Sequence, residues 1–370
     1  MGRQWVWFWK ALALILLITA NADAAGTIKV GVAGPLTGDQ GALGQELKNG
    51  AIIAVEEWNA KGGLLGQKIE IVWGDDQHDP KQAVAVANKF VNEGVAGVIG
   101  HFNSSCSIPA SNIYRDGNVV QLTPASTNPQ FTERGLWNVF RVCGRDDQQG
   151  GVAANFIAKK LKKTKVAVLH DKTTYGQGLA DETVKALEKA GIKPVYYGSV
   201  TQGEKDYRPV LTAVRQRQPE ALFYGGIYPE AVMLTKQMRE LGMKTVFISG
   251  DGVWAKEFIE IAGKAAEGAF ITFTPDQTKI KEAQEVIQRH KQKFGTAVGA
   301  YTVYSYVAAV LLFEAIAATH SVDSVKIAEH IRATKWKTAL GPIQFDKKGD
   351  VLVSPYVVWE VKNGKFVELQ

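Results

Sequence analysis

The sequence predicts an α/β protein made of two doubly wound, Rossmann-like lobes joined by a three-stranded hinge. Of its 370 residues, 46% are hydrophobic and 22% are charged, which is enough apolar surface for two cores. From residue 27 onward, apolar strand patterns alternate with amphipathic helix patterns, and the alternation starts again after residue 150. The last hundred residues lack the strands for a sheet of their own. We therefore expect them to complete both lobes, so that the chain crosses between the lobes three times.

In the first lobe, Asp79 and Pro80 mark a helix start, because Asp is a good N-cap and Pro fits the first helical position. The glycine pair at 62–63 marks a helix end. The expected elements are strands at 28–33, 69–73, 98–100 and 119–122, and helices at 44–61 and 79–91.

The second lobe follows a polar, glycine-bounded run at 140–150 that suits a hinge. Its expected strands are 165–170, 194–200, 221–224 and 245–249, with helices at 175–190, 206–217 and 229–241.

In the last part we expect helices at 279–294 and 300–319 and strands at 343–345 and 356–360. The helix at 300–319 is almost wholly apolar, but Glu314 interrupts it, which favours a core helix over a membrane span. The predicted lobes are 26–145 plus 275–352 and 146–274 plus 353–370.

The first 25 residues are predicted to be a signal peptide. Arg3 and Lys10 precede and flank an apolar run at 11–20 that is too short to span a bilayer, and a small-x-small cleavage site ends at Ala24. The protein is therefore expected to be exported. A retained N-terminal anchor is the alternative, because the leader contains three tryptophans.

Lys and Arg are spread through the helical stretches without forming a block, so we expect a solvated surface and no nucleic-acid partner. Cys106 and Cys143 are the two cysteines. In an oxidising compartment they could form a disulfide, or they could remain inert thiols, and the sequence leaves both open.

Enzyme motifs for metalloproteases, serine hydrolases, phosphate-binding loops and thiol redox sites are absent from the sequence. His101 lies beside a strand end, where a hydrogen-bonded structural role is favoured over that of a base. The carboxylates of Asp75, Asp76 and Asp79 fit a loop and a helix cap better than a metal site. We expect no catalysis, no metal and no cofactor.

Two strand-to-helix junctions suggest an anion site. The strand at 98–100 leads into Ser104 at a helix start, and the strand at 119–122 leads into Thr127 and its neighbours. Free N–H groups at a helix start favour anions, and consecutive parallel strands end at one crevice. In the second lobe, Asp251 follows a strand between two glycines, which lets the backbone come close to a ligand. We expect the crevice to bind a small amino acid.

Several segments resemble the Leu/Ile/Val-binding proteins of bacterial ABC importers. They are DDQHDPKQAVAVANK at 75–89, IGHFNSS at 99–105, TPASTNP at 123–129, HDKTTYG at 170–176 and YGG at 224–226. The resemblance covers essentially the whole chain after the leader. It implies a type I periplasmic binding fold, a periplasmic monomer whose lobes close on one amino acid, and a membrane permease as partner.

The resemblance also implies roles for single residues. Ser104 and Thr127 would bind the α-carboxylate, and the Ala125 carbonyl, the Thr127 hydroxyl and the Asp251 carboxylate would bind the α-ammonium. The full set of expected ligand-binding residues is Leu43, Phe102, Ser104, Ala125, Ser126, Thr127, Tyr175, Ile227, Asp251 and Tyr301.

The chain departs from the family pattern at several of these positions. Asp251 stands where the family usually has Glu, Leu43 and Ile227 stand where it often has tyrosines, and His78 and Asn103 replace a cysteine pair. We expect an aliphatic or branched-chain amino acid as ligand. The alternative is a regulatory or receptor domain of the same fold that senses another small amino acid, amide or carboxylate. The leader and the lack of a helix-turn-helix segment disfavour that alternative.

Overall fold

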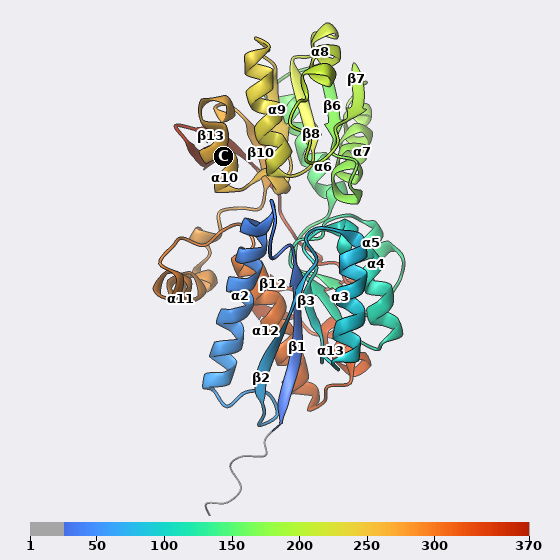
Figure 1. Cartoon of the computed structure of the whole chain (residues 1–370), viewed down its shortest axis with the longest axis vertical. Helices are drawn as coiled ribbons and strands as arrows, with labels where there is room; N and C mark the ends of the chain where they lie inside the picture. Colours follow the sequence, from blue (N-terminus) through green and yellow to red (C-terminus); the bar gives the residue numbers. More distant parts are fainter. Residues whose placement is uncertain (1–25, 370) are drawn as a thin grey trace, which may run out of the picture.

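The computed structural model describes residues 26–369. The predicted leader, residues 1–25, lies outside the described residues. Two sheets, each with helices on both faces, follow one another along the long axis of the molecule (Figure 1). This confirms the predicted class of two doubly wound α/β lobes.

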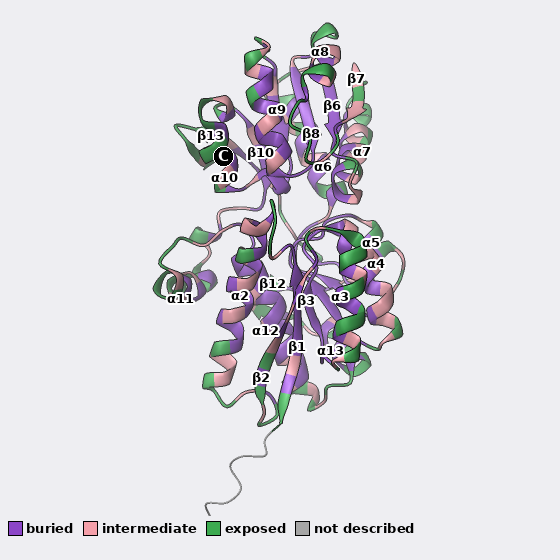
Figure 2. Ribbon diagram, viewed as in Figure 1, coloured by how far each residue is buried: buried purple, intermediate pink, exposed green. Residues whose placement is uncertain are grey.

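The first sheet contains five parallel strands in the order β2-β1-β3-β4-β5. The strands are largely buried, as expected for a parallel sheet between two helical layers (Figure 2). Their bounds are β1 (Thr27–Gly34), β2 (Lys68–Asp75), β3 (Val98–Gly100), β4 (Gln121–Thr123) and β5 (Val139–Arg141).

One face of this sheet is covered by α2 (Gly41–Ala60) and α12 (Thr302–Thr319), and the other by α3 (Pro80–Asn92) and α4 (Ser104–Asp116). Asp79 caps α3, because its carboxylate accepts the N–H groups of Lys81 and Gln82 at 2.6 and 3.0 Å. The helices α5 (Gln130–Glu133), α11 (Gln284–Phe294) and α13 (Ser324–Ala333) and the hairpin of β11 (Trp336–Thr338) and β12 (Gly341–Ile343) complete this part.

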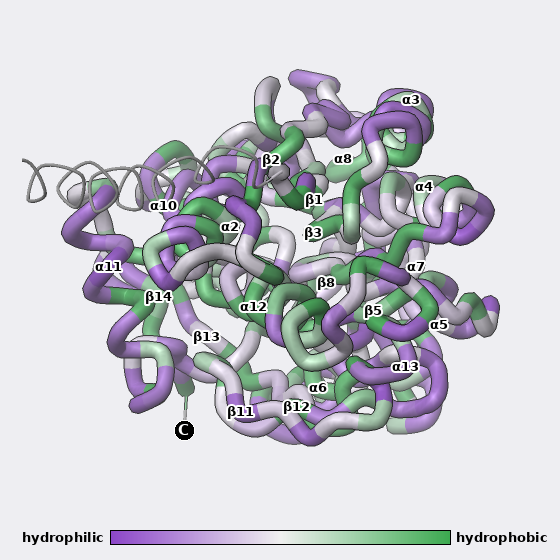
Figure 3. The backbone as a smooth tube through the Cα atoms, turned by 90° about the horizontal axis from the view of Figure 1, so that it is seen from below, coloured by the Kyte–Doolittle hydropathy of each residue, from purple (hydrophilic) through white to green (hydrophobic). Residues whose placement is uncertain are grey.

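α12 is the helix, among residues 26–369, that is long and apolar enough to cross a bilayer, and 67% of it is buried in the protein. It packs beside α2 against β3 and β4 of the first sheet, as a core helix does. Figure 3 shows the same division, with hydrophobic strands and α12 in the middle and the outlying α11 mostly hydrophilic.

The second sheet has seven strands in the order β14-β13-β10-β9-β8-β6-β7. The strands from β10 to β7 are parallel, and the two C-terminal strands add an antiparallel edge. Their bounds are β6 (Val166–His170), β7 (Tyr196–Ser199), β8 (Ala221–Gly225), β9 (Val246–Ser249), β10 (Phe270–Phe273), β13 (Val357–Lys362) and β14 (Lys365–Glu368).

Helices again cover both faces of the second sheet. α6 (Asp146–Asn155), which continues into a π-helical turn at Phe156–Lys160, packs beside α7 (Thr174–Lys189) on one face. The helices on the other face are α8 (Arg208–Gln216), α9 (Tyr228–Glu240) and α10 (Lys256–Ala262).

The chain passes between the two sheets at three places. It leaves the first sheet after β5, returns after β10, and enters the second sheet again before β13. A buried ion pair joins two of these crossings, because Arg141 at the end of β5 donates to Asp350, which precedes the third crossing, at 2.6 Å. Arg145 within the first crossing also donates to Asp350 at 2.6 Å.

Two predicted elements were misplaced. The helix expected at 279–294 begins only at Gln284, because Asp276 caps a separate 3₁₀ turn and Ile280 is extended. The strand expected at 343–345 lies at Gly341–Ile343, and Phe345 forms only a single bridge with Val351.

Four strands were missed. β5, β10, β11 and β14 are three or four residues long, so their sequences are too short to show a clear period. β5 lies within the run that we interpreted as a hinge, and the first crossing begins directly after it.

The contact between α2 and α12 gives a matched test of packing. A Cβ atom on Gly50 would lie 2.2 Å from the Thr302 carbonyl oxygen, whereas a Cβ atom on Gly151, in α6, would meet nothing within 4 Å. Gly50→Ala should therefore lower the free energy of unfolding by about 1–3 kcal/mol. Gly151→Ala should raise it by about 0.5–1 kcal/mol, as Ala does within a helix. Urea denaturation of both variants checks this, and shifts of the same sign would contradict the close packing.

Candidate functional site

A small cavity of about 20 Å³ lies where the carboxyl ends of the two sheets meet. Segments that follow β3 and β4 form one side, and segments that follow β6, β8 and β9 form the other. The residues that line it are Phe102, Asn103, Ser104, Ala125, Tyr175, Ile227, Asp251, Gly252 and Tyr301. Seven of the ten residues predicted from the sequence are therefore brought together in one place.

Ser104 is the first residue of α4, so its side chain and the free N–H groups of the helix start lie at the cavity. The Ser104 hydroxyl accepts the N–H group of Asn128 at 3.2 Å, which fixes the loop after β4 against the helix start. The positive end of the α4 dipole adds to the N–H groups. This side of the cavity is suited to a carboxylate.

The loop after β4 is held in place by hydrogen bonds from a buried guanidinium group. Arg141, which is fully buried, donates to the carbonyl oxygens of Ser126 at 2.7 Å and Asn128 at 3.0 Å. The Ser126 hydroxyl is also hydrogen-bonded, to the Phe102 carbonyl oxygen at 2.8 Å. The anion side of the cavity is thus preorganised by the protein itself.

The opposite side contains the Asp251 carboxylate, which is 4% exposed. It accepts the hydroxyl groups of Tyr175 at 2.8 Å and Tyr301 at 3.0 Å. Burial raises the pKa of Asp251, although these hydrogen bonds oppose the rise. Burial also raises the pKa values of both tyrosines, so their hydroxyl groups remain donors.

None of the described Lys, Arg or His side chains forms an ion pair with Asp251; its partners are the neutral hydroxyl groups. A buried carboxylate is costly without a positive partner. A cationic group from a ligand would supply that partner.

Tyr301 forms the wall between the two sides. Its ring lies against Phe102 with a centroid distance of 4.7 Å in an edge-to-face arrangement. Ile227 adds an aliphatic surface from the second sheet. The space beside Asp251 is therefore apolar and narrow.

The glycines around Asp251 allow close packing. A Cβ atom on Gly250 would lie 2.3 Å from Leu179, and one on Gly252 would lie 3.0 Å from the ring of Tyr175. The Gly252 N–H group also donates to the Tyr175 hydroxyl oxygen at 3.0 Å. The glycines thus make room for Tyr175, which then holds Asp251.

Three predicted residues do not line the cavity. Leu43 is buried in the core next to the cavity. Ser126 is buried in the loop after β4, and its hydroxyl group is bonded to the Phe102 carbonyl oxygen. The Thr127 hydroxyl is buried and has no hydrogen-bond partner of regular geometry.

Asp146 was missed by the sequence analysis. It is the first residue of α6, it is fully buried, and among the described residues neither carboxylate oxygen has a hydrogen bond of regular geometry, although the Thr127 hydroxyl lies close enough to oppose the rise in its pKa. Its N–H group donates to the Thr127 carbonyl oxygen at 3.0 Å. Burial and the nearby Asp251 raise its pKa. The two adjacent acids at 146–147 could have indicated a functional role, but we interpreted the run at 140–150 only as a hinge.

The other candidates have structural roles. His101 is fully buried between Asp76 at 2.6 Å and the Tyr114 hydroxyl at 2.9 Å. Both cysteines are buried free thiols, so of the two alternatives the structure contains unpaired thiols and not a disulfide. Residues 26–369 hold no group of three or more His, Cys, Asp or Glu side chains that could bind a metal.

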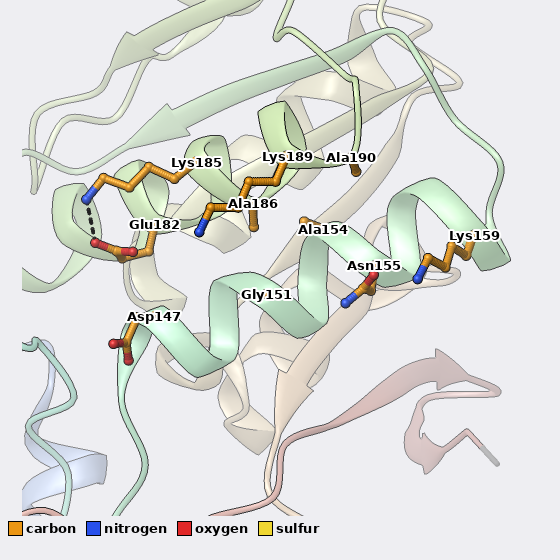
Figure 4. A pocket seen from close by; sticks show the side chains of 10 residues that line it. All are labelled: Asp147, Gly151, Ala154, Asn155, Lys159, Glu182, Lys185, Ala186, Lys189 and Ala190. Atoms are coloured by element: carbon orange, nitrogen blue, oxygen red, sulfur yellow. Dashed lines mark hydrogen bonds and ion pairs between the residues drawn. The ribbon is translucent and has the colours of Figure 1, made fainter.

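A second hollow lies between α6 and α7 on the outside of the second sheet (Figure 4). Small residues such as Gly151 and Ala186 form its floor, and lysines stand along it. It lacks the convergence of strand ends, buried acid and aromatic walls that marks the first cavity.

Comparison with known proteins agrees with this geometry. Residues 27–365 match the family described as periplasmic binding protein, and the chain belongs to that family. Its members are solute-binding proteins of ABC importers, not enzymes.

Individual relatives are similar over nearly their full length. Leu/Ile/Val-binding protein homolog 2 of Brucella abortus is 45% identical over 96% of this chain and 95% of the relative. A leucine-, isoleucine-, valine-, threonine- and alanine-binding protein of Pseudomonas aeruginosa is 38% identical over 91% of this chain and 90% of the relative. The crystal structure of a leucine binding protein from Thermotoga maritima has a TM-score of 0.87 and 32% identity, covering 93% of this chain and 98% of that one.

Glu46, in α2, positions Tyr301. Its carboxylate accepts the Tyr301 N–H group at 2.9 Å, and the side chain lies tightly against Gly299. Burial raises the pKa of Glu46 from 4.5 to about 8, and Glu257 adds to the rise. The folded protein thus holds a proton on Glu46 that the unfolded chain loses above about pH 4.5.

This shift predicts a pH dependence of stability. The contribution of the protonated Glu46 to the free energy of unfolding is fully present below pH 4.5 and is lost as the pH rises toward 8. Glu46→Gln keeps an acceptor for Tyr301 but cannot ionise. We expect the free energy of unfolding to fall more between pH 5 and pH 8 in the wild type than in Glu46→Gln, measured by urea denaturation. Equal slopes would show that Glu46 ionises normally in the folded state.

Proposed function

We propose that this protein captures an aliphatic or branched-chain amino acid of the Leu/Ile/Val type in the cavity between its lobes and delivers it to the membrane permease of an ABC importer. The names of the relatives support this, since both curated relatives described above are named for leucine, isoleucine and valine. The aligned structure from Thermotoga maritima is named a leucine binding protein.

The buried Asp251 carboxylate is the observation that carries the proposal. It faces the cavity without a cationic partner, and the N–H groups of a helix start lie on the other side. A free amino acid is a zwitterion, so it offers an ammonium to one side and a carboxylate to the other. The arrangement is complementary to both charges.

The ten residues expected from the sequence keep their roles in this proposal. Ser104, Thr127 and the backbone around Ser126 bind the α-carboxylate, and Asp251 with the Ala125 carbonyl binds the α-ammonium. Phe102, Tyr175, Ile227 and Tyr301 enclose the side chain, with Leu43 behind them.

The lobes are 26–145 plus 275–352 and 146–274 plus 353–370, and they close about the three crossings. Hydrogen bonds already bridge them, from Asn128 to the Thr174 carbonyl oxygen at 2.7 Å and from Tyr228 to the Asp39 carbonyl oxygen at 2.6 Å. In this proposal the protein is exported through the leader at 1–25, acts in the periplasm as a monomer, and uses neither cofactor nor metal.

Calorimetry with the twenty amino acids tests the function directly. Each CH₂ group buried against Ile227, Phe102 and Tyr301 should contribute about 0.8 kcal/mol to binding. Leucine, isoleucine or valine should therefore bind more tightly than aspartate, lysine or a sugar. Tighter binding of any member of the second group would refute the proposed ligand class.

Substitutions at the two sides of the cavity should weaken amino-acid binding by different amounts. Removing one partner of a desolvated charge pair costs roughly 2–5 kcal/mol, so Asp251→Ala should weaken amino-acid binding about 30- to 3,000-fold. Thr127→Ala removes one of several neutral donors and should cost about 1 kcal/mol, or roughly fivefold.

Asp251→Asn is the second variant, because it removes the charge while keeping the shape of the side chain and one acceptor oxygen for a tyrosine hydroxyl. Its NH2 group can donate to the hydroxyl oxygen of the other tyrosine. Calorimetry with the best ligand measures all three variants. If both Asp251 variants bind within about threefold of the wild type, the ligand has no ammonium at Asp251 and the amino-acid assignment fails.

A further inference from the structure

The end of the second sheet where its parallel strands begin, opposite the cavity, is strongly basic. We call it the basic edge. In a parallel sheet all helix C-termini and strand N-termini lie at one edge, which here is the edge opposite the ligand cavity. The basic edge is formed by six connections at 156–165, 188–195, 215–220, 239–245, 263–269 and 362–365.

These six connections carry fourteen Lys and Arg residues and four Glu residues, a formal net charge of +10. The whole chain has a formal net charge of only +6, so the remainder of the molecule is net negative. Five of the lysines form one run, KKLKKTK at 159–165, which the sequence analysis did not single out, and the other nine basic residues are spread over the five remaining connections. The fold gathers them at one end.

The dipoles of the helices do not account for this charge. Lys and Arg are favoured at any helix C-terminus. The matching connections of the first sheet, at 60–67, 93–97, 116–120 and 134–138, carry two basic and two acidic residues. The positive charge is therefore specific to the second sheet.

Most of these cations are free to meet a partner. Lys159, Lys160, Lys162 and Lys165 are exposed and form no ion pair with the described residues, and Lys163 has a single distant one, to Glu220 at 3.9 Å. Figure 4 shows Lys159 and Lys189 standing at the hollow between α6 and α7, which opens toward this edge.

The chemistry of the basic edge fits a surface of phosphate groups. Eleven of its fourteen basic residues are lysines, which act as point charges without the fixed geometry of Arg. The six connections contain one aromatic residue, Phe156, and it packs against Phe270. A single-stranded nucleic acid would need aromatic platforms for its bases, so the edge is poorly suited to one.

We propose that the basic edge binds a membrane surface that carries anionic phospholipid headgroups. This inference rests on the proposed function in one respect, namely that the protein works outside the cell interior beside a membrane permease. The edge lies at the opposite end of the second sheet from the ligand cavity, so the cavity stays free when the protein is bound to the membrane. Local attachment would raise the concentration of protein near the permease.

Co-sedimentation with lipid vesicles tests the proposal, with the protein purified after export. The wild type should bind phosphatidylglycerol vesicles at low ionic strength, release at high salt, and leave phosphatidylcholine vesicles unbound. A Lys near an anionic surface is worth roughly fivefold in affinity, so combining Lys159→Gln, Lys160→Gln, Lys162→Gln and Lys163→Gln should weaken binding more than 100-fold.

The matched control changes four exposed lysines of the first lobe, Lys281, Lys291, Lys326 and Lys337, to Gln. It lowers the net charge equally and should keep most of the vesicle binding. Equal losses in both variants, or no binding by the wild type, would overturn the proposal. Binding to heparin without binding to phosphatidylglycerol would also overturn it, in favour of a soluble acidic partner.

Amino-acid binding by the same variants separates the two proposals. We expect all of them to bind the amino acid as the wild type does, because their substitutions lie far from the cavity. Vesicle binding that is absent while amino-acid binding is intact contradicts only the membrane inference. Amino-acid binding that is absent while vesicle binding is intact contradicts only the proposed function.

Discussion

The Asp251 carboxylate is enclosed where the two lobes meet. Most features of the site follow from the free-energy cost of removing this carboxylate from water. Two tyrosine hydroxyl groups donate to it, one from α7 and one from the start of α12, so each lobe contributes one donor. Neutral donors reduce the desolvation penalty but do not neutralise the charge. A second buried carboxyl group, Asp146, lies nearby. In the proposed function, a ligand with an ammonium completes the interface between the lobes and so couples binding to closure.

The anion side depends on a different buried charge. Arg141 is fully buried and is paired with Asp350, and its remaining donors bond to the carbonyl oxygens of the loop after β4. Arg145 shares the same carboxylate. This one network therefore fixes the loop that faces the ligand and ties the first and third crossings together. In the proposed function, this network lets the lobes move about the crossings while the anion site keeps its shape.

The sequence predicted the architecture well, because long buried strands and amphipathic helices have clear periods. It failed for β5, β10, β11 and β14, which are short, and for the region around Ile280, where side-chain hydrogen bonds break the helix pattern.

The structure brings together most of the residues that follow strands in the predicted site, since parallel strands end at a common edge, and their role in ligand binding stays a prediction. Asp146 was missed because its burial comes from packing between the lobes, which local sequence does not encode. The role of Glu46 was missed for the same reason, because its partner Tyr301 is distant in the sequence. The basic edge of the second sheet combines one lysine run at 159–165 with residues from five connections that only the fold brings together.

A crystal structure of the protein with leucine bound tests the central claim most directly. The account predicts that the leucine ammonium lies about 2.7–2.9 Å from an Asp251 carboxylate oxygen, as expected for a charge-assisted hydrogen bond, with the leucine carboxylate at the start of α4. A leucine bound elsewhere, or bound in the cavity with its ammonium away from Asp251, would contradict it.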